Sequence, residues 1–420
     1  MQPKLGFAGM THLGLVSGVC AAEKGFEVVG FDPDAERVAA LAQGRLPVSE
    51  PQLDALVAGN AARLRFSADA AALRDCDVVY VAPDVPTDDA GGSDLGPIDA
   101  LLARVFDATR EGCVIVVLSQ VPPGFTRGRQ RPGRILHYQV ETLIFGRAVE
   151  RALEPERYIV GCADPSIPLP PAYAAFLGAH GCPILPMRFE SAELAKISIN
   201  MCLVASVSVA NTLAELCEKI GADWSEIVPA LKLDRRIGQY AYLAPGLGIA
   251  GGNLERDLAT VCQLADERGT DAGVVRAWIA NSRHRRDWPL GVLHRELLSK
   301  QDDPLIAVLG LAYKQDTHST KNSPSLALLE RVGAFRVRVF DSVVPASAAR
   351  HPRCHGAGSE LEACDGADAL VVMTPWSRFA KVDPGEIARR MRGRLVLDPY
   401  AVLDAGACSR AGLTYLTLGR

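Results

Sequence analysis

Lys196 and Asn200 are the two side chains whose types and spacing point most directly to chemistry. They lie four positions apart in the segment 191–219, which reads as one long helix, so both project from the same helical face. A lysine removed from water has a lowered pKa, which suits proton transfer. A pair of ordinary surface residues is the alternative. We expect the helix to be largely buried because its other side chains are apolar, namely Ile197, Ile199, Met201, Leu203 and Val204.

A glycine-rich segment, Pro245–Asp257, is the second candidate for chemistry, and it runs into a predicted helix. Four glycines in its first eight residues allow the backbone to approach a ligand closely. Arg235 and Arg236 precede it, and guanidinium groups suit an anion such as a diphosphate. An ordinary connection with two solvated arginines is the alternative. The glycines that would present amides to a ligand are Gly248, Gly251 and Gly252.

Residues 4–34 follow the plan of a dinucleotide-binding βαβ unit. We expect a strand at Lys4–Ala8, a helix at Leu15–Lys24 and a second strand at Glu27–Phe31, closed by Asp32. An acid at that place accepts hydrogen bonds from an adenosine ribose and repels a 2′-phosphate, so NAD is favoured over NADP as cofactor.

The turn of this unit supplies most of the candidate cofactor residues. Its first glycine permits a tight turn, and its last lets helix and strand pack closely. Thr11 replaces the middle glycine of the usual G-x-G-x-x-G pattern, so we expect its side chain to crowd or redirect a diphosphate. The candidates are Gly9, Met10, Thr11, His12, Leu13 and Gly14.

Two later strands, Cys76–Ala82 and Val114–Ser119, end in polar loops. Ligands of open parallel sheets bind beyond the carboxyl ends of the strands. Pro83 and Val85, in the loop Pro83–Gly92, are therefore candidate cofactor contacts, and Gln120 follows the second strand. Each loop, taken singly, could be a plain turn.

A second α/β unit begins at Pro304. We expect strands at Leu305–Leu309, Val337–Phe340, Ala369–Met373 and Leu395–Leu397. The predicted fold class is α/β, with two Rossmann-like parallel-sheet domains joined by a long central helix and a helical connector. The expected parts are a dinucleotide-binding domain at 1–190, the central helix and connector at 191–300, and a substrate domain at 301–420.

Length and composition are those of a globular protein of two or three domains, with 420 residues and 48% apolar side chains. The formal charge of -4 gives no reason to expect nucleic acid as a partner. No apolar run reaches the roughly 18 residues that a membrane span needs, so we expect no membrane contact. Eleven scattered cysteines without metal spacing suggest reduced thiols in the cytoplasm and no metal site.

These pieces together resemble the UDP-glucose/GDP-mannose dehydrogenase family over nearly the whole chain. The resemblance rests on seven ordered segments: Gly9–Gly25, Pro83–Leu95, Val121–Gly124, Lys196 with Asn200, Leu233–Gly238, Pro245–Asp257 and Gly310–Pro324. Members of this family oxidise the C6 alcohol of a nucleotide sugar to a carboxylate with two NAD⁺. The resemblance implies a nucleotide-sugar substrate, usually a homodimer, and a sugar-nucleotide role for Tyr313 and Lys314.

Departures from the family pattern fall in the segments that carry its chemistry. The family's glycine-rich loop ends in a cysteine, which becomes a thiohemiacetal and then a thioester, and four residues later in an aspartate. The aspartate matches Asp257, the cysteine position holds Asn253, and the lysine before the aspartate is Arg256. Gln120 stands for the family threonine, and Lys321 for an arginine. Of two family glutamates, Glu141 is retained and the second is Phe145.

Three functional hypotheses follow. The first is an NAD-dependent dehydrogenase that performs a single two-electron step with Lys196, Asn200 and Asp257 and needs no covalent intermediate. Related β-hydroxyacid dehydrogenases are similar in lacking a cysteine. The second is a repurposed member that uses bound NAD for a redox-neutral change such as epimerisation. The third is a non-catalytic nucleotide-sugar-binding protein. We rank them in this order.

Overall fold

The computed structural model describes residues 2–86, 88 and 92–420. Residue 1, and residues 87 and 89–91 of the predicted Pro83–Gly92 loop, lie outside the described residues. The chain divides into two compact units, 1–199 and 200–420. The helical segment that follows residue 199 belongs to the second unit, and the three-part division expected from the sequence stays a prediction.

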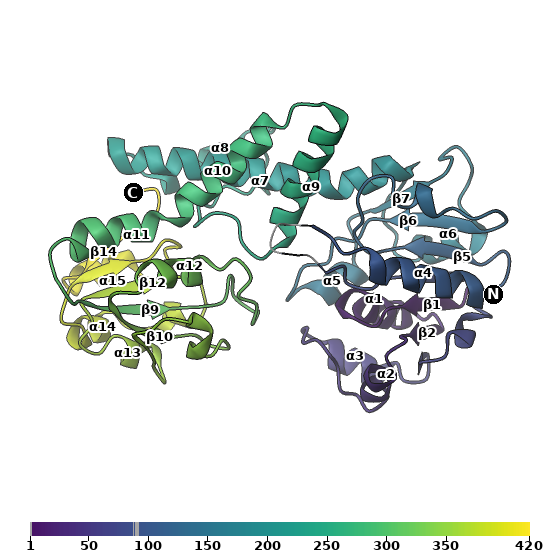
Figure 1. Cartoon of the computed structure of the whole chain (residues 1–420), viewed down its shortest axis with the longest axis horizontal. Coiled ribbons are helices and arrows are strands. Elements are labelled where there is room, and N and C mark those ends of the chain that lie inside the picture. The colour runs from purple at the N-terminus through teal and green to yellow at the C-terminus, as the bar shows by residue number, and fades with distance from the viewer. Residues whose placement is uncertain (1, 87, 89–91) are drawn as a thin grey trace. The chain divides into compact units, whose positions relative to one another are not determined.

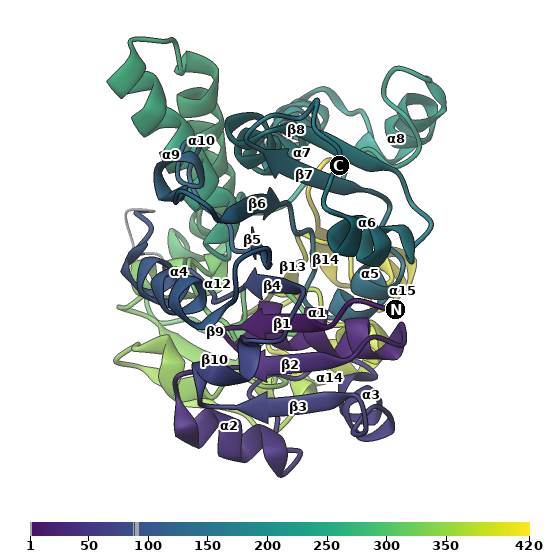
Figure 2. The same cartoon turned by 90° about the vertical axis from the view of Figure 1, so that its right-hand side faces the viewer.

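The first unit is built on an eight-stranded sheet in which only one pair of neighbouring strands, β6 and β7, is antiparallel. Figure 2 shows the strands stacked in sheet order. That order is β3 (Leu64–Ser67), β2 (Val28–Phe31), β1 (Leu5–Ala8), β4 (Val78–Val81), β5 (Val114–Val117), β6 (Ile135–Gln139), β7 (Tyr158–Cys162) and β8 (Ile184–Arg188).

Successive residues of each strand supply the two faces of this sheet, because side chains alternate along a strand. Phe7 and Tyr80 pack under one layer of helices, whereas Ala8 and Val79 pack under the other. The first layer contains α1 (His12–Glu23), α3 (Leu53–Gly59), α5 (Ala148–Leu153) and α6 (Pro171–Gly178). The second contains α4 (Gly96–Ala108), while α2 (Ala35–Ala42) lies next to β3.

The βαβ unit predicted at the N-terminus is present, with one correction to its turn. Helix α1 begins at His12, three residues before the predicted start, so residues 12–14 form its first turn rather than part of a loop. The strands β1 and β2 are parallel neighbours in register from Leu5 opposite Val28 to Ala8 opposite Phe31.

Helix α7 (Phe189–Ile220) is the long helix predicted from the sequence. The expectation that it is largely buried is wrong: Lys196 is half-buried, and several apolar side chains reach solvent in this chain. Among the described helices α7 alone is long and apolar enough to cross a membrane by length and composition, which corrects the expectation that no segment is. Core helices of soluble proteins meet the same criterion. The exposed set is Leu194, Val209, Leu213, Leu216 and Ile220.

The second unit combines helices with a six-stranded, wholly parallel sheet (Figure 1). Its strand order is β11 (Cys354–Gly356), β10 (Arg336–Phe340), β9 (Leu305–Leu309), β12 (Ala369–Val372), β13 (Leu395–Leu397) and β14 (Thr414–Leu416). The helices before the sheet are α8 (Trp224–Leu233), α9 (Asn253–Arg268), α10 (Gly273–Arg286) and α11 (Trp288–Leu293). Those connecting its strands are α12 (Pro324–Arg331), α13 (Glu360–Ala363), α14 (Pro384–Arg390) and α15 (Ala405–Arg410).

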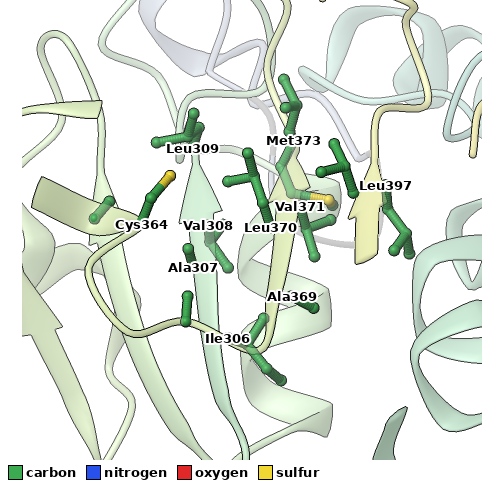
Figure 3. Close-up of a cluster of buried hydrophobic side chains, with 14 of the residues drawn as sticks. Ile306, Ala307, Val308, Leu309, Cys364, Ala369, Leu370, Val371, Met373 and Leu397 are labelled. Atoms are coloured by element: carbon green, nitrogen blue, oxygen red, sulfur yellow. The ribbon is translucent and has the colours of Figure 1, made fainter. Parts of the chain in front are cut away.

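Apolar residues of the central strands form the core of this second sheet, as Figure 3 shows for β9 and β12. Ile306, Val308, Leu370 and Val371 are fully buried, the pattern of parallel strands covered on both faces. In each sheet the strand that comes first in the sequence, β1 or β9, lies inside the sheet, and the strand order reverses beside it, as in Rossmann folds. The predicted fold class is therefore confirmed.

Candidate functional site

The turn between β1 and α1 depends on two glycines. Gly9 has φ +93°, a conformation that side chains with a Cβ rarely adopt. A Cβ on Gly14 would lie 2.0 Å from the carbonyl oxygen of Gly9, so only glycine lets α1 start this close to the strand. The first turn of α1 thus directs its free backbone N–H groups to the carboxyl edge of the sheet, where anions bind.

Of the side chains in the turn between β1 and α1, some pack in the core and others lie at the carboxyl edge of the sheet. Met10 is buried in the core below α1, and Leu13 packs against the same core. Their contribution to a cofactor site is therefore limited to their backbones. Thr11 is half-buried.

Asp32, directly after β2, is 1% exposed and already holds the turn together. Its Oδ2 accepts hydrogen bonds from the Met10 N–H at 2.7 Å and from Nη1 of Arg37 at 2.8 Å. Its Oδ1 accepts one from the Asp34 N–H at 2.9 Å. This places a fixed carboxylate at the end of β2, where a ribose of a dinucleotide is bound in Rossmann folds.

Asp84 forms two hydrogen bonds at the start of α1, one with Thr11 and one with His12. The Asp84 N–H donates to Oγ1 of Thr11 at 3.0 Å, and the Asp84 carboxylate accepts from the His12 N–H at 3.3 Å. Pro83, beside them, passes close to Gly9, and its carbonyl accepts a hydrogen bond from Ser119. Val85 is half-buried. The loop after β4 is therefore attached to the helix terminus through Asp84.

His12 connects the same helix turn to the loop after β6. Its Nε2 lies 2.8 Å from Oε1 of Glu50, and its ring stacks on Phe145 with 4.2 Å between the ring centroids. Glu50 also accepts from the Gly146 N–H at 2.9 Å. These contacts hold the segment with Phe145 against the N-terminus of α1.

Glu141, at the start of that loop, is half-buried. Burial raises the pKa of its carboxyl, against the opposing effects of the Thr142 N–H and of the nearby Lys196 charge. Glu141 also lines a pocket together with Ser17, Tyr80, Gln139 and Arg151. The first unit therefore holds an acid and a lysine that influence each other's charge, the kind of pair used in proton transfer.

The loop after β5 is fixed by Glu193 of α7. This fully buried carboxylate accepts from the Gly124 N–H at 2.6 Å and the Thr126 N–H at 2.8 Å. Burial raises the pKa of Glu193, and the two amides oppose the rise. The arrangement positions the segment that begins with Gln120, which is half-buried.

Asn200 is held one helical turn beyond Lys196 on α7. Its Nδ2 donates to Oδ2 of Asp257 on α9 at 2.5 Å. Asp257 is 1% exposed, and Nε of the buried Arg256 lies 3.4 Å from its other oxygen. In the second unit the predicted residues Asn200, Arg256 and Asp257 are therefore brought together.

Asn253 is the first residue of α9, and its side chain is exposed. It lies one turn before Asp257, so both project from the same side of the helix. Gly252 precedes it with φ +90°, and Gly251 has φ +93°.

Both of these glycines are covered by side chains of the second sheet's first loop. A Cβ on Gly251 would lie 2.4 Å from the Tyr313 ring, and one on Gly252 would lie 3.1 Å from the Lys321 side chain. Gly248 is covered instead by the backbone of Ser282, 2.4 Å from its Cβ position. The glycine-rich segment therefore brings Tyr313 and Lys321 to the start of α9.

The remaining predicted substrate residues are not gathered into this arrangement. Arg236 is exposed and paired with Asp234 at 2.7 Å, and Arg235 is exposed. Nζ of Lys314 lies 5.8 Å from the centre of the Tyr313 ring.

Three of the side chains that organise the site were missed by the sequence interpretation: Glu50, Asp84 and Glu193. Isolated acids in loops and on a helix give no spacing signal, because each acts on backbone N–H groups remote in sequence. Among the described residues, no group of three or more His, Cys, Asp and Glu side chains is placed to hold a metal ion.

The first unit has a largely parallel sheet, a glycine turn between its first strand and first helix, and a buried aspartate directly after its second strand. These features define a dinucleotide-binding protein of the Rossmann type. Residues 3–168, 190–283 and 307–405 match, in that order, the NAD binding, central and UDP binding domains of the UDP-glucose/GDP-mannose dehydrogenase family. The chain belongs to this family.

Relatives of known activity cover almost the whole chain. A UDP-glucose 6-dehydrogenase of Pseudomonas aeruginosa is 31% identical over 98% of this chain and 96% of its own. The UDP-glucose 6-dehydrogenase TuaD of Bacillus subtilis is 28% identical over 99% of this chain and 93% of its own. A UDP-glucose dehydrogenase structure from Pyrobaculum islandicum has a TM-score of 0.83 and 25% identity, covering 97% of this chain and 98% of that one.

The NAD-binding domain and these dehydrogenase relatives indicate NAD as the cofactor. The first unit fits it: the N-terminus of α1 suits a diphosphate, and Asp32 suits a ribose. The Asp84 carboxylate, which accepts a hydrogen bond from the His12 N–H, opposes an anion at this turn.

Proposed function

We propose that this protein is an NAD-dependent oxidoreductase of nucleotide sugars that is limited to one two-electron step between an alcohol and a carbonyl. The residue that carries the proposal is Asn253, which we assign from the sequence pattern to the family's cysteine position and which begins α9. A carboxamide is not a nucleophile of the kind that forms a thiohemiacetal, so the route to a carboxylate through a thioester is closed.

The remaining candidates suffice for a single oxidation. When bound, NAD⁺ accepts a hydride from the carbon that bears the alcohol. In its unprotonated form Lys196 would take the hydroxyl proton on Nζ, so that the products are a carbonyl, NADH and a protonated lysine. Asn200 is oriented by Asp257 and offers the rest of its amide to the substrate oxygen. Glu141 and Gln120 complete our set of candidate catalytic residues, with Glu141 close enough to Lys196 to affect its charge.

The proposed substrate is a UDP-sugar or another nucleotide sugar. The match of residues 307–405 to the family's UDP binding domain supports this class. Tyr313 and Lys321, beside Gly251 and Gly252, offer an aromatic face and a cation to such a ligand.

We also propose a cytoplasmic homodimer. The eleven cysteines are free thiols, as expected in a reducing compartment. Val209, Leu213, Leu216 and Ile220 form an exposed apolar row on α7 with helical spacing, and a second copy of the chain would remove it from water. Light scattering across a concentration range tests the dimer.

The stoichiometry of cofactor reduction tests the central proposal. Purified protein is incubated with excess NAD⁺ and limiting UDP-sugar, NADH is counted by absorbance, and the product is identified by mass spectrometry. We expect one NADH per sugar and a product two mass units lighter. Two NADH and a carboxylate would refute the proposal.

The same experiment separates the alternatives. A redox-neutral enzyme would change the sugar without net NADH and would carry NAD(H) through purification. A binding protein would retain nucleotide sugar, but Lys196→Ala would leave every measured activity unchanged.

A further inference from the structure

We infer that Asp84 competes with NAD for its own binding site and, held there by Thr11, makes the cofactor weakly bound and readily exchanged. The inference rests on the family's NAD site and not on the reaction that the enzyme performs. It gives a role to a residue that the sequence patterns did not single out.

The geometry is a pair of hydrogen bonds that Asp84 forms across the start of α1. The Asp84 carboxylate accepts the His12 N–H at 3.3 Å, while Oγ1 of Thr11 accepts the Asp84 N–H at 3.0 Å. Thr11 stands at the position of the middle glycine in the dinucleotide pattern. A glycine there has no hydroxyl, so the side chain that would crowd a diphosphate is also the one that retains Asp84.

A diphosphate and this carboxylate need the same donors. The first N–H groups of a helix have no acceptor within the helix, and they bind anions with help from the helix dipole. In a Rossmann fold the diphosphate of the dinucleotide binds at this terminus. Because Asp84 already accepts from His12, the first helical residue, a diphosphate must displace the carboxylate or share the terminus with it.

The charges around Asp84 favour displacement over sharing. No lysine or arginine among the described residues lies within ion-pair distance of Asp84, so no side-chain cation offsets its charge at this terminus. A dinucleotide brings two further negative charges, and like charges a few ångströms apart repel even near a solvated surface. Asp84 is exposed, so it can turn outward into water when the cofactor arrives.

Weak retention of the cofactor has a functional meaning. A dehydrogenase that releases NADH in each cycle benefits from a cofactor that leaves quickly, whereas an enzyme that reuses one bound cofactor benefits from a tight one. The Asp84–Thr11 pair therefore favours NAD as an exchanging co-substrate.

Isothermal titration calorimetry of the full-length protein without sugar tests the inference. We compare wild type with Asp84→Asn, which keeps size and removes charge, and Asp84→Ala, which removes both. Asp164→Asn is the control for net charge, because Asp164 is an exposed loop aspartate that accepts hydrogen bonds from Ser166. NAD⁺ and ADP-ribose carry the diphosphate, and adenosine lacks it.

We expect NAD⁺ and ADP-ribose to bind roughly 5–10-fold more tightly to Asp84→Asn, and at least as tightly to Asp84→Ala. Adenosine affinity, and every affinity of Asp164→Asn, should stay within about twofold of wild type. Unchanged or weaker NAD⁺ binding in Asp84→Asn, or an equal gain for adenosine, would overturn the inference. A failure of the two-electron proposal would appear in the NADH count and would leave these affinities unaffected.

Discussion

Replacing Asn200 with leucine should destabilise the second unit, because it leaves a buried carboxylate short of a partner. Asn200→Leu keeps the side-chain volume but removes the Nδ2–H that donates to Asp257 at 2.5 Å. Asp257 is 1% exposed, so water cannot replace the lost donor without opening the contact between α7 and α9.

The size of the effect follows from the charge of the acceptor. Hydrogen bonds to charged groups contribute about 1.5–3 kcal/mol, roughly twice the value for neutral pairs. For a unit of this size that corresponds to a fall of roughly 3–12 °C in its melting temperature. Arg256, 3.4 Å from the other carboxylate oxygen, is retained and should keep the loss within this range.

The matched control is Asn281→Leu on α10. The substitution is the same, but Nδ2 of Asn281 donates to a neutral hydroxyl, Oγ1 of Thr212 on α7, at 3.0 Å. This contact is exposed. We expect that variant to lose about 0.5–1.5 kcal/mol.

The assay is urea denaturation combined with hydrogen–deuterium exchange of α9, for Asn200→Leu, Asp257→Leu and the double variant. The double variant should lose less than the sum of the two single variants, since each single change already breaks the same hydrogen bond and Asp257→Leu takes the carboxylate from Arg256 in both backgrounds. Additive losses in the double variant, or an Asn200→Leu loss no larger than that of Asn281→Leu, would contradict this account.

Two further predictions concern the first unit. Gly14→Ala should abolish measurable NAD⁺ binding in calorimetry and lower stability by about 3 kcal/mol or more, since its Cβ would lie 2.0 Å from the Gly9 oxygen. Gly18→Ala, in the same helix with its nearest contact at 3.3 Å to the Phe7 side chain, should be much milder; equal effects would argue against this role for Gly14. Glu141→Gln should change the pH dependence of stability. Burial raises the folded-state pKa of Glu141 above its usual 4.5, so the native state binds the proton more tightly. Wild type should lose stability as pH rises from about 4.5 through the raised pKa, whereas Glu141→Gln should lose less. Parallel stability curves for the two proteins over that window would contradict the burial effect.

The sheets were predictable because parallel strands that are buried on both faces appear in the sequence as continuous runs of apolar residues. Leu305–Leu309 and Leu395–Leu397 are found with the predicted bounds, and both are continuous apolar runs. The start of α1 was misplaced because residues 12–14 were assigned to the glycine turn. Thr11 is of a type favoured at N-caps, but in the structure its side chain makes no cap and accepts from the Asp84 N–H instead.

The sequence predicted those site residues that belong to local patterns, and it did not predict those that act on distant backbone groups. Asn200 and Asp257 belong to local patterns of the family, and the structure brings them together. Asp84, Glu50 and Glu193 act on backbone amides 67 to 98 positions away, so no local pattern indicates them. The prediction that α7 is largely buried was wrong because an apolar composition does not show whether the rest of the same chain covers the apolar side chains of a helix.

The division between the two compact units falls inside α7, between Ile199 and Asn200. Domains usually meet at exposed linkers, which proteases cut first. Here the backbone is helical on both sides of the division, so mild proteolysis should spare it. Expressing the two units separately would cut α7 and leave a part of that helix on each fragment. The spacing of Lys196 and Asn200 is fixed by one helical turn, and only fracture of the helix could alter it.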